Sequence, residues 1–220
     1  MKSKFILLTS VALAAVAFTY TSASAADPIA PAKSPIYVSV FGGASFLNDV
    51  SGFSSGSSYA TAKTNLGYLF GGAIGAHLNE NFRAEIELSH ARWSVNSISS
   101  NGSPFSPAQG QFSATYLLGN IWYDFKSESA FTPYLGGGVG IGLPHADFTA
   151  NGGVDSDTPV DLAFQLGLGF KYAVSDNIDL DVGYRFKDIP NFTQKFSGFP
   201  DVTGNTFASH NLQVGVTFNF

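Results

Sequence analysis

The 220-residue sequence contains no cysteine, one methionine and few charged residues, which make up 12% of the chain. Without cysteine there is no disulfide framework, so cysteine usage neither requires nor excludes an exported protein. The formal net charge is −5 and no basic patch occurs, so nucleic acid is not expected as a partner. Beyond residue 25 no apolar run is long enough to cross a bilayer as a helix.

Glycine and aromatic residues are abundant instead, with 24 glycines and an aromatic content of 15%. Glycine is favoured in turns, and aromatic side chains are enriched in strands. This composition therefore indicates many short strands and turns rather than helices.

The N-terminus has the order of an export signal. Lys2 and Lys4 precede an apolar run from Phe5 to Phe18, and the small residues Ala23-Ser24-Ala25 follow. This order predicts a Sec signal peptide over residues 1–25, cleaved after Ala25, and the apolar run is too short for a membrane span. Removal of the two lysines changes the formal net charge from −5 to −7. We expect a short periplasmic segment over 26–34 and one domain over 35–220.

Strict alternation marks the mature chain. The stretch VDLAFQLGLGFKY, Val160–Tyr172, is apolar at every even position and small or polar at every odd one. Such a period of two predicts a strand with one apolar and one polar face. A soluble sheet could bury the apolar face against a core, so one strand alone does not decide the fold class. The full set of predicted strands is Ile36–Phe46, Leu66–Leu78, Phe82–Leu88, Gln111–Phe125, Phe131–Leu143, Val160–Ala173, Ile178–Lys187 and Asn211–Phe220.

Two of these strands depart from clean alternation. Bulky residues occupy both faces of TYLLGNIWYDF, and Asn120 shares its parity with Leu118 and Trp122, which predicts a bulge or a mixed lining. In FTPYLGGGVGIGL the even positions are Tyr134 and four glycines. The glycines lack the spacing of a phosphate-binding loop, and we interpret them as inward positions that leave room for long neighbours.

The connections decide the fold class. The short connections 79–81, 126–130 and 174–177 alternate strictly with the long connections 47–65, 94–110, 144–159 and 188–206. Outer-membrane barrels have short periplasmic turns and long external loops, and strands of about 9–11 residues suffice to cross at a tilt. We predict an all-β protein: an eight-stranded antiparallel up-and-down transmembrane β-barrel whose apolar face lies against outer-membrane lipids. Aromatic girdles are expected from Phe82, Tyr123, Phe125, Phe131, Tyr172 and Phe218 below and from Phe46, Tyr68, Phe112, Tyr184 and Phe186 above.

Particular motifs strengthen this prediction through a resemblance. The stretch YLLGNIWYDFKSESAFTPYLGGGVGIG, the strand IDLDVGYRF and the terminal Phe220 resemble the OmpA-like and opacity-protein superfamily, which includes alphaproteobacterial porin-family and surface-antigen proteins. The resemblance implies an eight-stranded barrel in a Gram-negative outer membrane. It also implies that the barrel assembly machinery recognises the C-terminal strand, with Phe220 as the assembly signal.

The opposite face of each strand predicts a charged interior. An eight-stranded lumen is just filled by side chains, and buried charges must be paired to be tolerated. We therefore expect the acids of the strands at 82–88 and 178–187 to pair with the four inward bases as a packed polar plug, with a polar pathway or gate as the alternative. The predicted lumen charges are Arg83, Glu85, Glu87, Asp161, Lys171, Asp179, Asp181, Arg185 and Lys187.

Catalytic and metal sites are not expected. The pairs Ser89-His90 and Ser209-His210 alternate across a strand, so neither pair forms a dyad. The His-x-Ser pattern of lipid A deacylases is absent, and His145 is placed in a loop near Asp147. No cofactor is expected either. A transition-metal site lacks close ligand spacing at all four histidines, His77, His90, His145 and His210.

The sequence leaves two candidate classes of function and a third, remote one. The first is an envelope structural protein or scaffold for surface loops, of adhesin or antigen type, which meets host or envelope partners through its external loops. The second is a small-solute porin. The remote third is a lipid-modifying outer-membrane enzyme.

Overall fold

The computed structural model describes most of the chain after the N-terminal segment. The chain divides into Met1–Ala32 and Lys33–Phe220, and every described residue belongs to the second unit. The predicted signal peptide (1–25) and periplasmic segment (26–34) lie outside the described residues. The described ranges are 35–54, 58–100, 102–105, 110–126, 129–148, 154–155, 158–194, 202–204 and 206–220.

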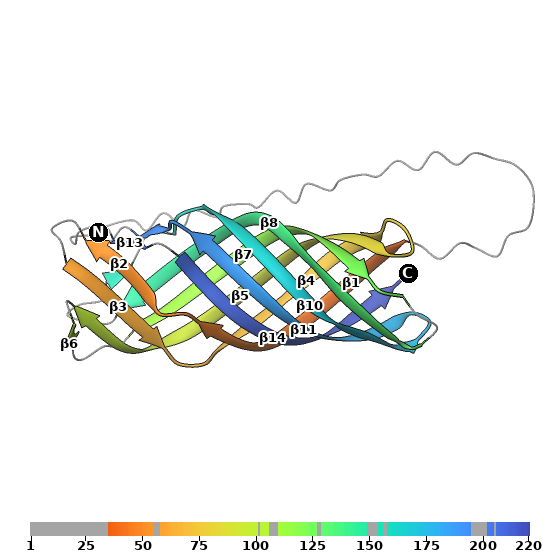
Figure 1. Cartoon of the computed structure of the whole chain (residues 1–220), viewed down its shortest axis with the longest axis horizontal. Coiled ribbons are helices and arrows are strands. Elements are labelled where there is room, and N and C mark those ends of the chain that lie inside the picture. The colour runs from red at the N-terminus through yellow and green to blue at the C-terminus, as the bar shows by residue number, and fades with distance from the viewer. Residues whose placement is uncertain are drawn as a thin grey trace, which may run out of the picture. The chain divides into compact units, whose positions relative to one another are not determined.

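Eight long strands form a closed antiparallel barrel, and this confirms the predicted fold class (Figure 1). Each strand pairs with its neighbours in chain order, and the first strand also pairs with the last, so Val40 lies opposite both Gly72 and Val216. Closure leaves no unpaired edge within the membrane, as hydrocarbon requires. The strands are β1 (Ile36–Leu47), β4 (Gly67–His77), β5 (Phe82–Ser100), β7 (Gly110–Asp124), β8 (Phe131–Phe148), β10 (Asp161–Ser175), β11 (Ile178–Pro190) and β14 (Thr206–Asn219).

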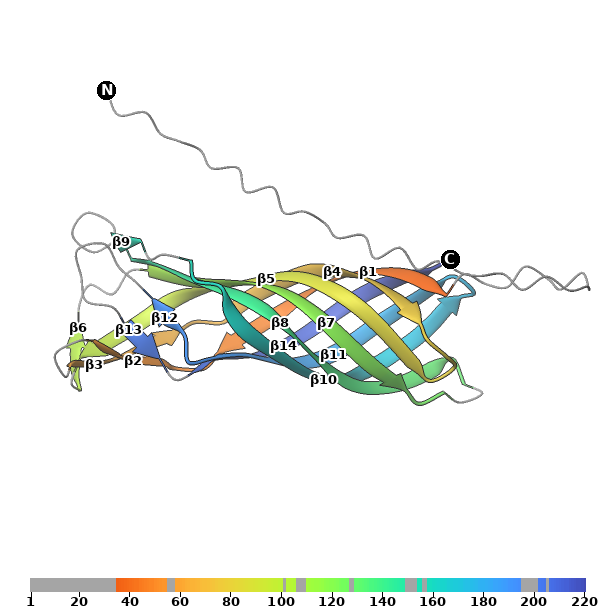
Figure 2. The same cartoon turned by 90° about the horizontal axis from the view of Figure 1, so that it is seen from above.

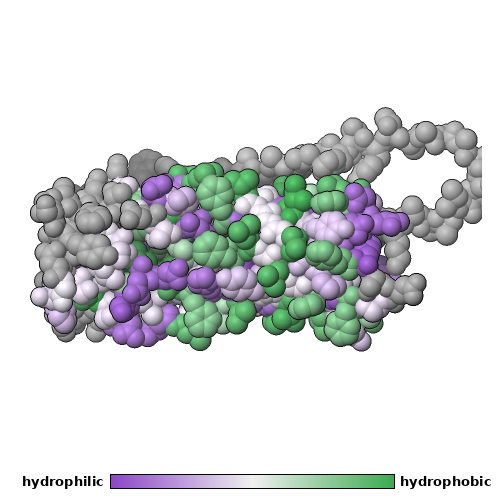
Figure 3. All heavy atoms as spheres, in the orientation of Figure 1, coloured by the Kyte–Doolittle hydropathy of each residue, from purple (hydrophilic) through white to green (hydrophobic). Residues whose placement is uncertain are grey.

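Side chains divide between the two faces as the alternation predicts. On β10, Leu166 is 65% exposed on the outer surface, whereas the adjacent Gln165 is 1% exposed inside. Hydrophobic residues gather over the middle of the barrel surface (Figure 3). No helix in the described part of the chain is long and apolar enough to span a membrane.

The predicted long loops contain additional strands at the end of the barrel away from the C-terminus (Figures 1 and 2). Above the pairing of Tyr68 with Arg92, β5 leaves β4 and pairs with β3 instead. The wall then continues from β3 through β2 and β13 to β12. Composition alone does not reveal these additional strands, because Ser and Gly in these segments are typical of turns. The short strands are β2 (Val50–Ser54), β3 (Ser58–Thr64), β6 (Ser103–Phe105), β9 (Val154–Asp155), β12 (Thr193–Gln194) and β13 (Val202–Gly204).

Of the two alternatives predicted for strand β7, a bulge or a mixed lining, the structure shows the mixed lining. Its pairing with β5 and β8 continues without a register shift, so no bulge is present. Even positions point inward, and the prediction that Phe112 faces lipid is therefore wrong: its ring is buried and packs edge-on against Phe207 at 6.1 Å. The loop placement of His145 is also wrong, since β8 extends to Phe148.

The glycines of β8 leave room for bulky neighbours, as the sequence indicates. A Cβ atom at Gly136 would lie 2.7 Å from the Trp122 ring, and one at Gly142 would lie 2.5 Å from Ile189. These positions therefore let large side chains from β7 and β11 fill the narrow lumen.

The C-terminal strand closes the barrel, and a deletion tests its predicted assembly role. The Phe220 amide donates to the Ile36 carbonyl at 3.2 Å, and the Phe220 ring is exposed. We expect deletion of Phe220 to lower insertion in cells severalfold. It should change the unfolding free energy of protein refolded in vesicles by only about 1 kcal/mol or less, as for other surface positions. Ile36→Ala, which truncates the paired residue, is the control, and equal losses in both assays would reduce Phe220 to an interfacial anchor.

Candidate functional site

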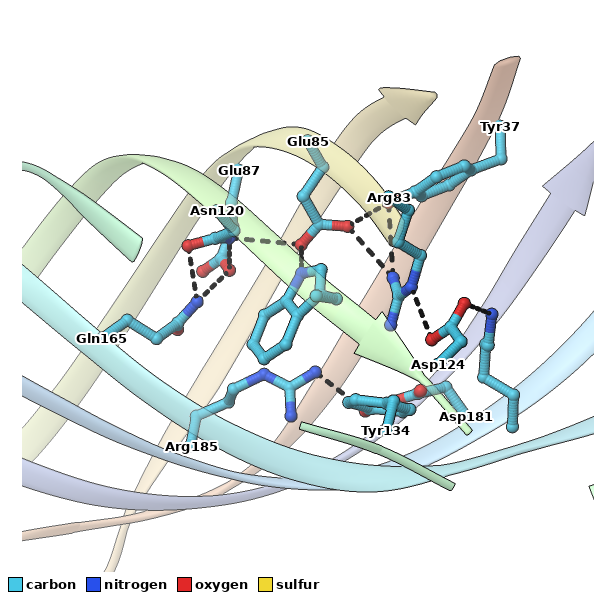
Figure 4. A network of polar contacts seen from close by, with 12 residues as sticks. Tyr37, Arg83, Glu85, Glu87, Asn120, Asp124, Tyr134, Gln165, Asp181 and Arg185 are labelled. Carbon is cyan, nitrogen blue, oxygen red and sulfur yellow. Dashed lines mark hydrogen bonds and ion pairs between the residues drawn. The ribbon is translucent and has the colours of Figure 1, made fainter. Parts of the chain in front are cut away.

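The lumen gathers most of the predicted charges. Six of the nine belong to one network of enclosed side chains. Asp181 joins this network through a hydrogen bond with Tyr134 (Figure 4). Asp179 lies at the periplasmic mouth, where it accepts a hydrogen bond from Asn219 at 3.0 Å. Asp161 lies apart, opposite Gly142, and its buried Oδ2 has no partner among the described residues. The six are Arg83, Glu85, Glu87, Lys171, Arg185 and Lys187.

A cluster near the periplasmic end centres on Asp124. Its carboxylate accepts from Arg83 Nε at 3.1 Å and from Lys171 Nζ at 2.7 Å, and all three side chains are buried. Arg83 also pairs with Glu85 at 3.4 Å. Asp124 thus contacts cations from two strands, β5 and β10, and Glu85 supplies the second negative charge of the cluster.

A second cluster lies at mid-lumen around Glu87. Lys187, which is 0% exposed, pairs with this carboxylate and donates to Ser89 Oγ at 2.8 Å. Glu87 also accepts from Asn120 Nδ2 at 3.1 Å and from Gln165 Nε2 at 3.0 Å. These contacts satisfy the buried ion pair from several strands, which is the condition for tolerating it.

Aromatic rings join the two clusters. The Arg185 guanidinium carbon lies 4.2 Å from the Trp122 ring centre, and its Nη2 donates to Tyr134 Oη at 2.8 Å. Tyr134 in turn donates to Asp181 at 2.9 Å. Trp122 Nε1 donates to Glu85 at 2.8 Å. Arg185 forms no ion pair within the described ranges, so the expected direct pairing of this base with an acid is wrong and cation–π contacts replace it.

Sequence analysis missed several members of the network. Half of them come from β7, whose two bulky faces concealed its phase, although Asn120 and Asp124 share a parity that could have revealed them. The sequence analysis gives Tyr37, Trp122 and Tyr134 no role in the network because their side chains carry no charge. The missed residues are Tyr37, Asn120, Trp122, Asp124, Tyr134 and Gln165.

The outer part of the lumen contains a large apolar cluster, which the sequence analysis did not predict. Phe207 lies at its centre, with Trp93 at 5.6 Å and Phe192 at 5.7 Å in edge-on contacts. Ile189 and Leu69 are buried in the same cluster. This cluster, which we call the apolar cap, adds an apolar layer above the charged one.

A vestibule of about 290 Å³ lies at the periplasmic mouth, lined by Lys126, Lys171 and Asp179 among others. Deeper in the lumen, a cavity of about 20 Å³ lies beside Arg83, Asp181 and Arg185. A cavity of this size holds about one water molecule.

In each of the two Ser-His pairs, the serine faces the lumen and the histidine faces the outer surface. Ser89 is buried in the lumen, whereas His90 contacts Thr115 Oγ1 at 2.9 Å on the outer surface. Ser209 is likewise buried, and His210 contacts Tyr184 Oη at 2.6 Å outside. Among the residues the structure describes, no three His, Asp or Glu side chains gather as a metal site.

Comparisons with known proteins agree with this architecture. PagN of Salmonella typhimurium is 29% identical over 120 residues, which is 48% of this chain and 49% of PagN, so the match spans about half of that relative. A Rickettsia felis protein named "Putative adhesin" is 28% identical over 160 residues, 66% of this chain and 71% of that protein. The crystal structure of OprG from Pseudomonas aeruginosa shares the fold with a TM-score of 0.62 at 15% identity, covering 86% of this chain and 98% of OprG.

A family model matches nearly the whole chain. The model for the outer membrane protein beta-barrel domain aligns with residues 10–220. The match includes all eight barrel strands and the charged lumen between them. The chain therefore belongs to the outer membrane protein beta-barrel domain family and is a protein of the bacterial outer membrane.

Proposed function

We propose that this protein is a closed barrel that serves as a scaffold for surface-exposed structure, of adhesin type, rather than as a pore. The observation that carries the proposal is the double filling of the lumen by a charged layer and an apolar cap. A solute would have to separate Lys187 from Glu87 and then displace Phe207 and its neighbours. Both layers are packed from several strands, so neither opens by movement of one side chain.

The outer end supplies the surface for a partner. Strands β2, β3, β12 and β13 extend the wall beyond the barrel pairings, and residues on such rigidly held outer segments commonly carry binding. The name of the Rickettsia felis relative supports an adhesin role for the protein. We infer no catalytic role, because in both Ser-His pairs the serine and the histidine face opposite sides of the wall.

Small-solute transport is the second candidate, and the periplasmic vestibule favours it. The vestibule is wide enough for several water molecules and carries both signs of charge. Deeper in the lumen, however, the buried Lys187–Glu87 pair and the apolar cap lie across this route. The two candidates therefore predict opposite results in an electrical measurement.

Planar-bilayer conductance tests the proposal. We expect wild-type protein to give only small, intermittent currents. Arg185→Ala should be less stable and should open more often, because it removes the guanidinium that fills the lumen between Trp122 and Tyr134. Glu80→Gln, in the exposed periplasmic turn 79–81, is the control and should leave both properties unchanged. Steady, large wild-type currents that Arg185→Ala does not alter would overturn the closed barrel and favour a porin.

Adhesion is tested separately on cells. Bacteria that display the wild-type protein should bind cultured host cells more than bacteria whose β2–β3 hairpin is replaced by a short turn. Both proteins should migrate as folded barrels in unheated detergent gels. Equal binding would remove the adhesin part of the proposal while leaving the closed barrel in place.

A further inference from the structure

Two buried guanidinium groups of the lumen keep N–H donors without acceptors. Arg83 is 6% exposed and Arg185 is 5% exposed. Arg83 Nη2 and Arg185 Nε are enclosed by protein, and neither atom has a hydrogen-bond partner among the described residues. The two groups are neighbours, because their guanidinium carbons lie 4.9 and 5.1 Å from the centre of the same Tyr134 ring (Figure 4). Buried donors are costly to leave unpaired, so these two indicate an acceptor in the space beside them.

Arg83 and Arg185 line the same small cavity of the lumen, which we call the inner cavity. Its volume of about 20 Å³ is enough for one water molecule. Asp181 of β11 also lines it. The rest of its polar lining comes from β1 and β14 and consists of Ser39, Gln213 and Thr217. The inner cavity therefore offers several polar partners to one small molecule.

Asp181 can accept more hydrogen bonds than the protein gives it. Its Oδ1 accepts from Tyr134 Oη at 2.9 Å, which is the one hydrogen bond that its carboxylate makes within the described ranges. A carboxylate offers about four acceptor positions. Arg185 forms no direct ion pair in the same part of the chain, although it lines the inner cavity together with Asp181. A molecule that both accepts and donates hydrogen bonds would connect this cation to this carboxylate.

The chemistry of the lining selects a neutral ligand. N–H groups without acceptors require an acceptor, which excludes a metal cation. The carboxylates of Glu85, Glu87 and Asp181 all line the inner cavity and repel an anion. No added charge is needed, because the described members of the lumen network include four bases and four acids. The bases are Arg83, Lys171, Arg185 and Lys187, and the acids are Glu85, Glu87, Asp124 and Asp181.

We propose that one ordered water molecule occupies the inner cavity and bridges Arg185 to Asp181. Its oxygen accepts hydrogen bonds from the guanidinium groups of Arg185 and Arg83, and it donates to the Asp181 carboxylate. The bridge gives Arg185 the acidic partner that it lacks in direct contact. The site rests on the proposed closed barrel, because a lumen open to solvent holds exchanging water rather than one ordered molecule.

Magnetisation transfer from water to side-chain N–H groups tests the proposal in the folded wild type. The protein carries ¹⁵N-labelled arginine and tryptophan, is reconstituted in phospholipid nanodiscs and is measured by rotating-frame NMR at mildly acidic pH, where hydrogen exchange is slow. We expect transfer from water to Arg185 Hε with the sign of a dipolar contact, which differs from the sign of hydrogen exchange. Arg185→Lys assigns the signal by removing it.

The two tryptophans are internal controls. Trp93 and Trp122 are both 0% exposed, their Nε1–H groups donate to Ser45 and Glu85, and neither ring lines the inner cavity. Both should show no transfer from water. Transfer to either tryptophan as well as to Arg185 would reveal a flooded lumen and overturn the closed barrel together with the single site. Silence at Arg185 and at both tryptophans would overturn the water bridge and leave the closed barrel in place.

Filling the inner cavity provides a second test. Ser39→Val replaces a hydroxyl group of the lining with apolar volume, so it should abolish transfer to Arg185 Hε and lower the urea midpoint of unfolding in vesicles. Ser39→Ala is the matched control, because it leaves room for the water molecule and should keep the transfer. Unheated detergent gels establish that both variants are folded. Retained transfer in Ser39→Val would contradict the bridge. A urea midpoint of the wild type that rises when chloride replaces gluconate at equal ionic strength would contradict it in favour of a bound anion.

Discussion

Lys187→Met is expected to lower the free energy of unfolding by about 3–5 kcal/mol, because it leaves a buried carboxylate without its cation. Lys187 and Glu87 are both enclosed at mid-lumen, and the remaining partners of Glu87 are the neutral Ser89, Asn120 and Gln165. Methionine keeps the length of the lysine side chain, so loss of volume contributes little. Urea titration of the protein in phospholipid vesicles measures the change.

Lys171→Met is the matched control at the periplasmic cluster. Its partner Asp124 keeps Arg83 at 3.1 Å, so the same substitution leaves no unpaired carboxylate there and should cost clearly less. The double variant Glu87→Gln with Lys187→Met should recover most of the loss, since neutral replacements of buried pairs are often tolerated. Equal costs at Lys187 and Lys171 would show that water reaches both clusters and that the lumen is not closed.

Leu168→Arg is expected to destabilise the barrel by about 2–4 kcal/mol, the cost of a cation on the lipid face at the midplane. Leu168 is 54% exposed on the outer surface, between Leu135 and Tyr184 in the register. A guanidinium there reaches neither interface without deforming the bilayer. The same vesicle titration measures the effect.

Val160→Arg provides the depth control on the same strand face. Val160 lies at the outer end of the apolar run, where a cation costs only about 0–1 kcal/mol. A cost for Leu168→Arg no larger than that for Val160→Arg would contradict the placement of β10 in the membrane. A shift of one residue would also move Leu168 to the lumen, where its substitution would act through packing.

The wall of the barrel follows from local sequence. Because side chains alternate strictly along a strand, the run from Val160 to Tyr172 already separates a lipid face from a lumen face. The alternation of short and long connections then gives the topology, since each strand crosses the membrane in the direction opposite to the strand before it. Inward positions such as Glu87 and Arg185 could be assigned for the same reason, as could the need for glycine at Gly136 beside a bulky neighbour.

The contents of the lumen depend on the closed tertiary structure. Asp124 rather than Asp179 neutralises Lys171, because strand tilt and register decide which residues of distant strands share a level, and no local pattern records that level. The apolar cap is likewise non-local: Trp93 and Phe112 lie on neighbouring strands, but Phe207 of β14 reaches both rings only when the barrel closes. The outer extension of the wall is decided by the switch of β5 from β4 to β3, which Ser- and Gly-rich sequence does not reveal. Sequence alone determined the barrel and its faces, whereas closure decided what fills the lumen and how the wall continues at the outer end.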